Sequence, residues 1–370
     1  MKRQRAYKFR LYPDREQEKL FHKTFGCCRF LYNQMLADKK EMYEKTGKAK
    51  RLTPAGYKKE HPWLKEVDSL ALANVQLHLE SAYKKFFREE RAGFPNFKSK
   101  HRSRKSYTTN VVNGNIRLEG GRLRLPKAGK VKIRCHREIP EGYVLKSVTV
   151  SMDRSGKYYA SLLYEYPAGE NQAAVKDMKE AEILGIDFAM QGMAVFSDGS
   201  RAKYPMYYRR AQEKLAREQR KLSHCQKGSR NYERQKRKLA RCHEKVRNQR
   251  KDYLHKLSRK IADRYDAAAV EDIDMKAMSR SLKFGKSVMD DSYGAFRDML
   301  RYKLGEQGKE LVKVDRFFPS SKMCSRCGSI KKELRLDERI YHCGCGNCMD
   351  RDVNAAVNIR EEGRRILMTA

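Results

Sequence analysis

Four cysteines near the C-terminus have the spacing of metal ligands. They form a C-x-x-C pair and, sixteen residues further on, a C-x-C pair: Cys324, Cys327, Cys343 and Cys345. Two such pairs are typical of a zinc ribbon, in which four thiolates surround one ion as a tetrahedron. The second pair is one residue shorter than C-x-x-C, so Cys348 is an alternative ligand. His342, just before that pair, is a further candidate.

Three acidic residues stand at the ends of predicted elements. Asp187 follows an apolar strand in LGID, Glu271 ends another in AVEDI, and Asp352 begins a helix in MDRDVNAAVNI. Converging carboxylates repel one another unless cations join them, and such oxygen ligands suit Mg²⁺. Two ions held in this way would activate water and stabilise the leaving oxygen in phosphodiester cleavage. Taken singly, each acid is equally explained as a cap, a turn residue or half of an ion pair.

Each of two acids has a competing neighbour. Adjacent side chains on a strand point to opposite faces, so only one of Glu271 and Asp272 can serve. Asp350 precedes Asp352 by two residues. We favour Asp352, at the start of a helix that faces the sheet.

The overall charge points to a polyanionic partner. The chain has 370 residues, enough for two or three domains, and a net charge of +37. Such a charge exceeds what solubility needs, and a nucleic acid is its usual partner. No apolar run approaches the roughly 18 residues of a membrane span, and the basic start MKRQRAYKFRLYP lacks the apolar core of a signal peptide. Cysteines gathered at one metal site fit a reducing cytosol.

The N-terminal half predicts helices placed between strands. Residues 1–15 alternate like a strand, and Pro13-Asp14 opens a helix. Helices are expected over 15–45 and 69–90. Short strands punctuated by glycine over 107–166 predict a small antiparallel barrel or sheet, and the polar residues 167–180 read as a linker.

The C-terminal half alternates strands and helices, which predicts an α/β domain with a largely buried sheet. ILGIDFAMQGMAVFSDG holds two strands, and AAAVE and ELVKVD are two more. Between Arg209 and Lys260 there are 20 Lys and Arg against five Asp and Glu. This stretch predicts long basic helices that turn at Gly228-Ser229 and suit a phosphate backbone.

Two further segments are candidates for nucleic-acid contact. The loop FPNFKSKHRSRKSY mixes aromatic and basic side chains, which suits base stacking and phosphate contact. The predicted helix over 69–90 has a polar side. The candidate residues are Asn74, Gln76, Lys84, Lys98, Arg102 and Arg104.

Taken together, these motifs resemble the TnpB (OrfB) family of insertion-sequence proteins, from which compact type V CRISPR effectors descend. The resemblance spans nearly the whole chain: YKFRLYPDREQEKLF, FGCCRFLYNQML, FPNFKSKH, LGIDFAM, AVEDIDM, FFPSSKMCSRCG and CMDRDVNAAVNIR. The visible departure is Ala189, where many relatives have glycine.

The resemblance implies a multidomain α+β fold. An N-terminal β-barrel (WED) would be built from residues 1–15 and 105–170, with a helical insert (REC) at 16–104. An RNase H-like α/β nuclease domain of the RuvC type would take 181–318 and 349–370. The zinc ribbon would be inserted at 319–348.

The resemblance also implies an activity: RNA-guided cleavage of double-stranded DNA beside a short flanking motif, at a single RuvC-type site. Asp187, Glu271 and Asp352 then take the catalytic positions with Mg²⁺, expected as two ions. The four cysteines hold a structural zinc. The partners implied are a guide RNA from the end of the element and the target DNA. No membrane or small-molecule substrate is expected, and the protein would be a monomer in its ribonucleoprotein, in a bacterial or archaeal cytoplasm at the nucleoid.

Three alternatives stay open at this stage. A non-cleaving RNA-guided repressor would keep the basic surface and lose an acid. An unguided zinc-ribbon protein, binding DNA or assisting transposition, would carry no specific RNA. A transposase that joins strands itself would need an end-binding domain, which the sequence does not reveal.

Overall fold

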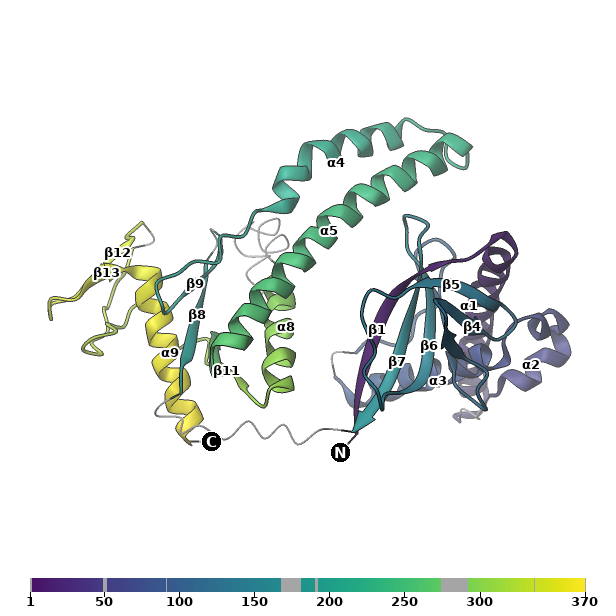
Figure 1. Ribbon diagram of the computed structural model, residues 1–370, viewed down its shortest axis with the longest axis horizontal. Helices are drawn as coiled ribbons and strands as arrows, with labels where there is room; N and C mark the ends of the chain where they lie inside the picture. Colours follow the sequence, from purple (N-terminus) through teal and green to yellow (C-terminus); the bar gives the residue numbers. More distant parts are fainter. Residues whose placement is uncertain are drawn as a thin grey trace. The chain divides into compact units, whose positions relative to one another are not determined.

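The computed structural model describes residues 2–48, 52–90, 92–167, 181–189, 192–273, 292–335 and 337–369. The chain divides into two compact units, Met1–Ala168 and Gly169–Ala370 (Figure 1). Within the described ranges, no helix has the length and apolar character needed to span a membrane. Of the predicted linker, residues 168–180 lie outside the described part.

The first unit contains one antiparallel sheet of seven strands, in the order β2-β6-β7-β1-β5-β4-β3. Its first strand pairs with β7 along almost its whole length, from Lys2 opposite Pro167 to Leu11 opposite Tyr158. The N-terminal segment therefore belongs to the same sheet as strands that follow a long helical insert. The strands are β1 (Lys2–Tyr12), β2 (Lys105–Asn110), β3 (Arg117–Glu119), β4 (Arg122–Leu125), β5 (Gly129–Arg134), β6 (Val144–Met152) and β7 (Tyr158–Pro167).

This sheet is curled but open (Figure 1). No hydrogen-bonded ladder joins the described residues of β2 to those of β3, the two edge strands. The antiparallel strands predicted for this region as a small barrel or sheet are confirmed, and the barrel-like WED layout stays a prediction. Since β3 has only three residues, it offers little backbone for a closing ladder.

Helices α1 (Arg15–Thr46) and α3 (Ser69–Arg88) share the core of this unit with the sheet. At the start of α1, the Asp14 side chain accepts the Gln17 N–H at 2.9 Å, and the Gln17 side chain accepts the Asp14 N–H at 3.1 Å. This capping box confirms the start predicted from Pro13-Asp14. Both long helices agree with prediction, whereas α2 (Pro54–Glu60) and the 3₁₀ turn η1 (Pro62–Glu66) were not foreseen.

The second unit contains a four-stranded sheet in the order β11-β10-β8-β9. Strand β10 runs parallel to β8 and β11, and β9 runs antiparallel to β8. The alternation of strands and helices predicted this α/β arrangement. The strands are β8 (Ile183–Ala189), β9 (Met193–Phe196), β10 (Ala267–Glu271) and β11 (Glu310–Val314).

Side chains alternate between the two faces of this sheet, and different helices cover each face (Figure 1). Ile186 and Val270 pack with residues of α5 (Arg230–Arg264) and α8 (Tyr293–Glu306). Ala269 packs instead with Ile359 of α9 (Arg351–Thr369). One face of the sheet therefore belongs to the C-terminal helix.

The basic stretch forms a helical hairpin of α4 (Tyr207–Ser223) and α5. Gly228, with φ of 85°, makes the turn, and the Ser229 hydroxyl accepts the Tyr232 N–H at 3.1 Å to cap α5. Leu215, Leu239 and Val246 form a small core between the helices. These findings confirm the predicted turn. With so thin an apolar seam, most of the hairpin's cations face solvent.

The cysteine-rich segment is built on a two-stranded sheet of β12 (Ile340–His342) and β13 (Cys348–Asp350). An isolated bridge between Met323 and Ile330 closes the turn around the first cysteine pair. Helix α9 begins directly after β13, so the chain runs from this small sheet into the helix that covers the larger one.

Candidate nucleic-acid surface, active site and zinc centre

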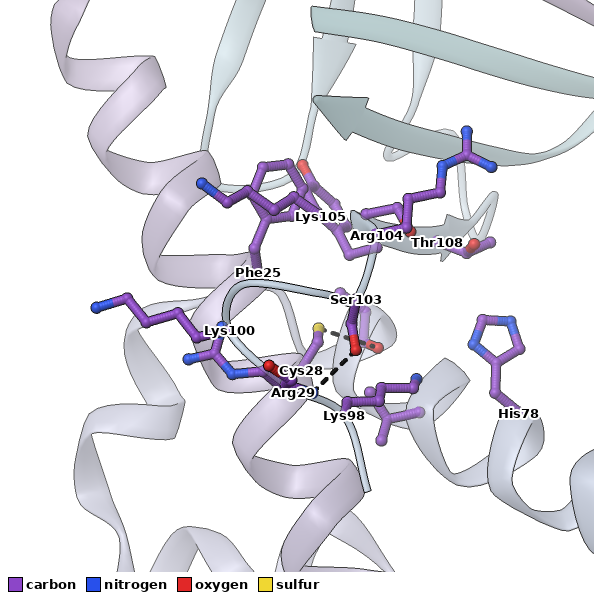
Figure 2. Close-up of a pocket in the computed structure, with 15 residues that line it drawn as sticks. Phe25, Cys28, Arg29, His78, Lys98, Lys100, Ser103, Arg104, Lys105 and Thr108 are labelled. Atoms are coloured by element: carbon purple, nitrogen blue, oxygen red, sulfur yellow. Dashed lines mark hydrogen bonds between the residues drawn. The ribbon is translucent and has the colours of Figure 1, made fainter. Parts of the chain in front are cut away.

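A basic cavity of about 350 Å³ opens in the first unit between α1, α3, β2 and the loop before β2 (Figure 2). Cations and hydroxyl groups line it and no carboxylate does, which makes it complementary to phosphate. The charged, imidazole and hydroxyl side chains in its wall are Arg29, His78, Lys98, Ser99, Lys100, Ser103, Arg104, Lys105, Ser106, Tyr107 and Thr108.

Lys98 is fixed in this wall. The Asn33 side chain donates to the Lys98 carbonyl at 2.9 Å and accepts the Lys98 N–H at 2.7 Å. The ammonium group lies 3.7 Å from the centre of the Tyr32 ring. Burial lowers the pKa of Lys98. Burying the charged ammonium group of Lys98 is unfavourable, and an anion bound in the cavity would offset part of that penalty.

Two of the predicted contact residues do not lie where the sequence placed them. Asn74 and Gln76 are buried at 6% and 8% exposure, so the expectation that they occupy the polar side of the helix was wrong. Their amides bond within the helix, to the Leu70 carbonyl and the Glu80 carboxylate. Lys84 is exposed, as expected. Arg102 is exposed on the loop, and Arg104 lines the cavity beside Lys98.

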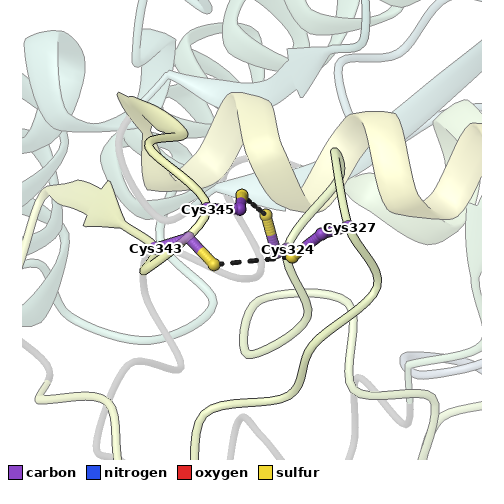
Figure 3. Close-up of side chains that lie close together, drawn as sticks. All are labelled: Cys324, Cys327, Cys343 and Cys345. Atoms are coloured by element: carbon purple, nitrogen blue, oxygen red, sulfur yellow. Dashed lines mark hydrogen bonds between the residues drawn. The ribbon is translucent and has the colours of Figure 1, made fainter.

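In the second unit, the four predicted cysteines come together (Figure 3). All four sulfur atoms lie within 4.8 Å of one another: Cys324, Cys327, Cys343 and Cys345. The Sγ atoms of Cys324 and Cys345 are 3.7 Å apart, and those of Cys327 and Cys343 are 3.6 Å apart. A tetrahedron with Zn–S bonds of about 2.3 Å requires S–S separations of roughly 3.8 Å. The cluster therefore fits zinc in both donor chemistry and size.

The surroundings of Cys324 favour its thiolate form. Burial alone would raise the pKa of Cys324. Hydrogen bonds from the backbone N–H groups of Cys327 and Arg326 and from the Asn347 amide outweigh that effect and lower the pKa to about 6. The Asn347 side chain donates to Cys324 Sγ at 3.4 Å. A metal binds the thiolate form of cysteine, so these hydrogen bonds favour Cys324 as a ligand.

The alternative ligands Cys348 and His342 lie outside the cluster. They face each other across the β12–β13 pair, His342 opposite Cys348. Cys345 thus completes the C-x-C pair as its spacing indicated.

The register of the larger sheet places Asp187 beside Glu271. Strands β8 and β10 are parallel, with Ile186 opposite Val270, so the next residues are again neighbours. Since Ile186 and Val270 face α5 and α8, the two acids face the side covered by α9.

Asp352 lies on the first turn of α9, close enough for its charge to raise the pKa of Asp187. The helix approaches β8 so closely that a Cβ added at Gly185 would lie 2.0 Å from the Ala356 carbonyl oxygen. Nearer its C-terminus, a Cβ at Gly363 would lie 2.3 Å from Ala269 Cβ on β10. Two glycines thus let α9 rest on both acid-bearing strands.

The three carboxylates influence one another. Burial raises the pKa of Asp187, and the charges of Asp352 and Glu271 raise it further, to about 7, against the opposing effect of Arg351. Burial also raises the pKa of Glu271. Among the described residues only the cysteines form a group with all ligand atoms within 4.8 Å, so the carboxylates lie further apart.

The neighbouring acids have other partners. Asp350 caps α9, accepting the N–H groups of Asp352 and Val353 at 3.0 Å each. Asp272 lies 3.0 Å from Lys313 Nζ and 3.2 Å from Arg297 Nη1. This geometry favours Asp352 and Glu271 over their neighbours as metal ligands.

Two residues beside the acids were missed by sequence reasoning. Arg201 Nη2 lies 2.8 Å from Asp350, and its Nη1 lies 3.8 Å from Asp352. The buried hydroxyl of Tyr293 has no hydrogen-bond partner among the described residues. Burial and then the charge of Asp187 raise the pKa of Tyr293. Nothing in the local sequence indicates that an arginine after a β-hairpin, or a tyrosine at the start of a helix, lies beside these acids.

Three family models match parts of the chain. They are "Probable transposase" of the OrfB_IS605 type over residues 161–282, "Cas12f1-like, TNB domain" over 293–359, and "Helix-turn-helix domain" of the OrfB_IS605 type over 1–48. In this structure the last region holds strand β1 and the single long helix α1.

Curated relatives match along most of their length. A protein of Streptomyces pristinaespiralis, named "Putative RNA-guided DNA endonuclease", is 36% identical over 97% of this chain and 89% of its own. The Escherichia coli protein InsQ, with the same description, is 32% identical over 99% of this chain and 94% of its own. Among solved structures, the protein of a Cas12f1-sgRNA-target DNA complex has a similar fold, with a TM-score of 0.59 at 15% identity over 97% and 99% of the two chains.

Proposed function

Because the chain belongs to the TnpB (OrfB) family of insertion-sequence proteins, we propose that it is an RNA-guided DNA endonuclease. It would cleave double-stranded DNA beside a short flanking motif by metal-dependent hydrolysis of a phosphodiester. The relatives named as RNA-guided DNA endonucleases match almost the full chain, which supports the same overall activity here.

The observation that carries the nuclease proposal is the meeting of three acids from distant segments. Asp187 and Glu271 are register neighbours on parallel strands, and Asp352 arrives on the helix that covers them. No ion pair with lysine or arginine is recorded for Asp187 or Glu271 within the described residues. Such a cluster is costly without a cation and favourable around one, which supports a divalent-ion site.

The carboxylate oxygens of these three residues would hold Mg²⁺, as one ion or two. When bound, the metal supplies an activated water and neutralises charge on the scissile phosphate. The chain's own part is to hold the three carboxylates close to one another, where a bound cation would favour their deprotonated forms. Arg201 and Arg351 lie within 3.8 Å of the Asp352 carboxylate and limit the repulsion at the site.

The structure supports a division of labour between the units. We assign the curled sheet as the WED domain, its helical insert as REC, and the second unit as a RuvC-type nuclease carrying a zinc ribbon. The basic cavity and the α4–α5 hairpin would contact phosphates of the guide RNA and target DNA. Lys98, Arg104 and the neighbouring Lys100 are the strongest candidates, and Arg102 and Lys84 are further ones. Zinc would be structural, because four protein ligands leave no open position for a substrate.

The first test couples RNA sequencing to a cleavage assay. The protein is expressed with the DNA that flanks its gene, and the co-purified RNA is sequenced. The complex is then given a plasmid library with randomised bases beside the target, with Mg²⁺ or with EDTA. A discrete RNA together with Mg²⁺-dependent cutting beside one motif is the expected result. A discrete RNA without cutting would favour the repressor, and absence of a specific RNA would favour the unguided protein.

Substitutions then test the site itself. Asp187→Ala and Glu271→Gln should each reduce cleavage by at least 10³-fold and leave RNA and target binding unchanged, because they remove metal ligands and no phosphate contacts. Asp272→Asn is the matched control and should keep most of the activity, since Asp272 pairs with Lys313 and Arg297. Equal loss in Asp272→Asn, or loss of target binding in Asp187→Ala, would contradict the assignment.

A further inference from the structure

Helix α9 carries two buried asparagines that the proposed chemistry does not use. Asn354 is 0% exposed and Asn358 is 2% exposed. Four residues apart, they lie on the same face of the helix. A fully buried amide is tolerated only where its polar atoms are bonded, so its partners reveal what it holds.

Both asparagines hold the backbone around the first zinc ligand. Asn354 Nδ2 donates to the Met323 carbonyl at 2.7 Å, and Asn354 Oδ1 accepts the Ser325 N–H at 3.0 Å. The single side chain therefore contacts the peptide groups on both sides of Cys324. Asn358 Nδ2 donates to the same Met323 carbonyl at 2.7 Å and to the Ser320 carbonyl at 2.8 Å.

The opposite side of the helix is pressed against the sheet. The contacts at Gly185 and Gly363 leave no room for even a methyl group, so α9 cannot slide or rotate on β8 and β10. The helix is thus fixed by close packing to the strands that carry Asp187 and Glu271. Its first turns are fixed by amide hydrogen bonds to the ribbon.

We infer that Asn354 and Asn358 are positioning residues that couple the zinc ribbon to the metal site of the carboxylates. Zinc held by the cysteines would order the backbone around Cys324, and the two amides would transmit that order to the start of α9. Asp352 lies two residues before Asn354 on the same helix, so its carboxylate would be held less firmly without the ribbon. The role in metal binding rests on the proposed nuclease site; the coupling between ribbon and helix does not.

Hydrogen exchange tests the coupling by itself. In the full chain, exchange of the amides of residues 351–358 is compared among wild type, Asn354→Ala, Cys327→Ser and the double variant. We expect Asn354→Ala to retain its zinc yet speed exchange at least tenfold. The double variant should exchange no faster than Cys327→Ser, because both substitutions disrupt the same coupling between the ribbon and α9. Unchanged exchange in Asn354→Ala, or additive effects in the double variant, would overturn the inference.

Binding of Mn²⁺, followed by its paramagnetic resonance signal, tests the consequence at the carboxylates. We expect Asn354→Ala and Asn358→Ala to weaken Mn²⁺ binding at least tenfold at temperatures where both remain folded. Merely structural asparagines would lower the melting temperature and leave the affinity unchanged, which would contradict a positioning role.

Asn33→Ala is the matched control. Asn33 holds the Lys98 backbone with the same pair of amide hydrogen bonds, but in the first unit. It should cost similar stability and leave Mn²⁺ binding unchanged. Asp187→Asn separates the two proposals: Mn²⁺ binding equal to wild type in that variant would overturn the nuclease site and the role in metal binding, while the exchange data would still decide the coupling.

Discussion

Asp187 is energetically unfavourable as an anion when no cation is bound. Burial and the charges of Asp352 and Glu271 raise its pKa to about 7. In an unfolded chain an aspartate titrates near 3.9. The folded state therefore binds this proton more tightly, and the free energy of unfolding falls as the pH rises through the window from about 4 to 7.

This linkage predicts a pH-dependent difference between two metal-free proteins. In EDTA, Asp187→Asn should be more stable than wild type at pH 8, and this advantage should shrink by on the order of 2 kcal/mol by pH 5. Urea denaturation of both proteins at several pH values measures the difference. Excess Mg²⁺ at pH 8 should stabilise wild type and not the variant. A difference that does not change with pH would contradict a raised pKa at Asp187.

Residue types and spacing predicted the acids and the cysteines, and the choice of Asp352 and Glu271 over their neighbours stays a prediction. The structure adds support for that choice, because Asp350 caps α9 and Asp272 pairs with Lys313 and Arg297. Both facts depend on tertiary contacts that no local pattern encodes. The same limit explains the error at Asn74 and Gln76: helical periodicity marks them as polar, but their burial depends on what packs against α3.

Helix α9 packs closely against the larger sheet at a glycine. Gly363 of α9 meets Ala269 of β10, whereas Gly26 of α1 has no atom within 4 Å of an added Cβ. The same substitution should therefore have opposite effects. Gly363→Ala should destabilise the second unit by roughly 2–3 kcal/mol through overpacking, and Gly26→Ala should stabilise the first by about 1 kcal/mol through helix propensity.

Thermal or urea unfolding of the two glycine variants provides the measurement. Because Gly363→Ala displaces the helix that carries Asp352, it should also lower the rate of DNA cleavage, whereas Gly26→Ala should leave that rate unchanged. A Gly363→Ala variant as stable as wild type would show that the structure relieves the close contact and would contradict this prediction.

Most elements were predictable because each has its own local signal. The capping box at Asp14, the turn at Gly228-Ser229 and the apolar runs of β8 and β10 all correspond to features of the structure. The openness of the first sheet was not predictable, since closure depends on whether β2 and β3 meet across the molecule. The order of β8, β10 and β11 likewise follows from parallel pairing between strands far apart in sequence.

At the scale of the whole molecule, the net charge of +37 governs association. Each phosphate contact releases counterions, so the affinity for nucleic acid should fall steeply as salt rises. Replacing both Arg29 and Lys100, which line the basic cavity, should reduce the slope of log affinity against log salt by roughly two. Filter binding of the co-purified RNA or of target DNA over a salt range of roughly 50–300 mM measures this slope.

A lysine of α1 outside the cavity provides the control for that measurement. Lys45 lies 2.6 Å from Glu41 and outside the cavity, so Lys45→Ala should change the slope by much less than one unit. Equal slopes for the cavity variant and for Lys45→Ala would show that the cavity makes no phosphate contact.

The pairing of segments that are synthesised early with segments that are synthesised late also determines which parts of the chain can fold first on the ribosome. Strand β1 lacks its longest partner until β7 has been made, and one face of β8 and β10 stays uncovered until α9 follows them. A translating ribosome therefore exposes the first unit and the basic hairpin while the third carboxylate is still unmade. Under the proposed function, a nascent chain can contact RNA before Asp352, the third carboxylate of the nuclease site, has been made.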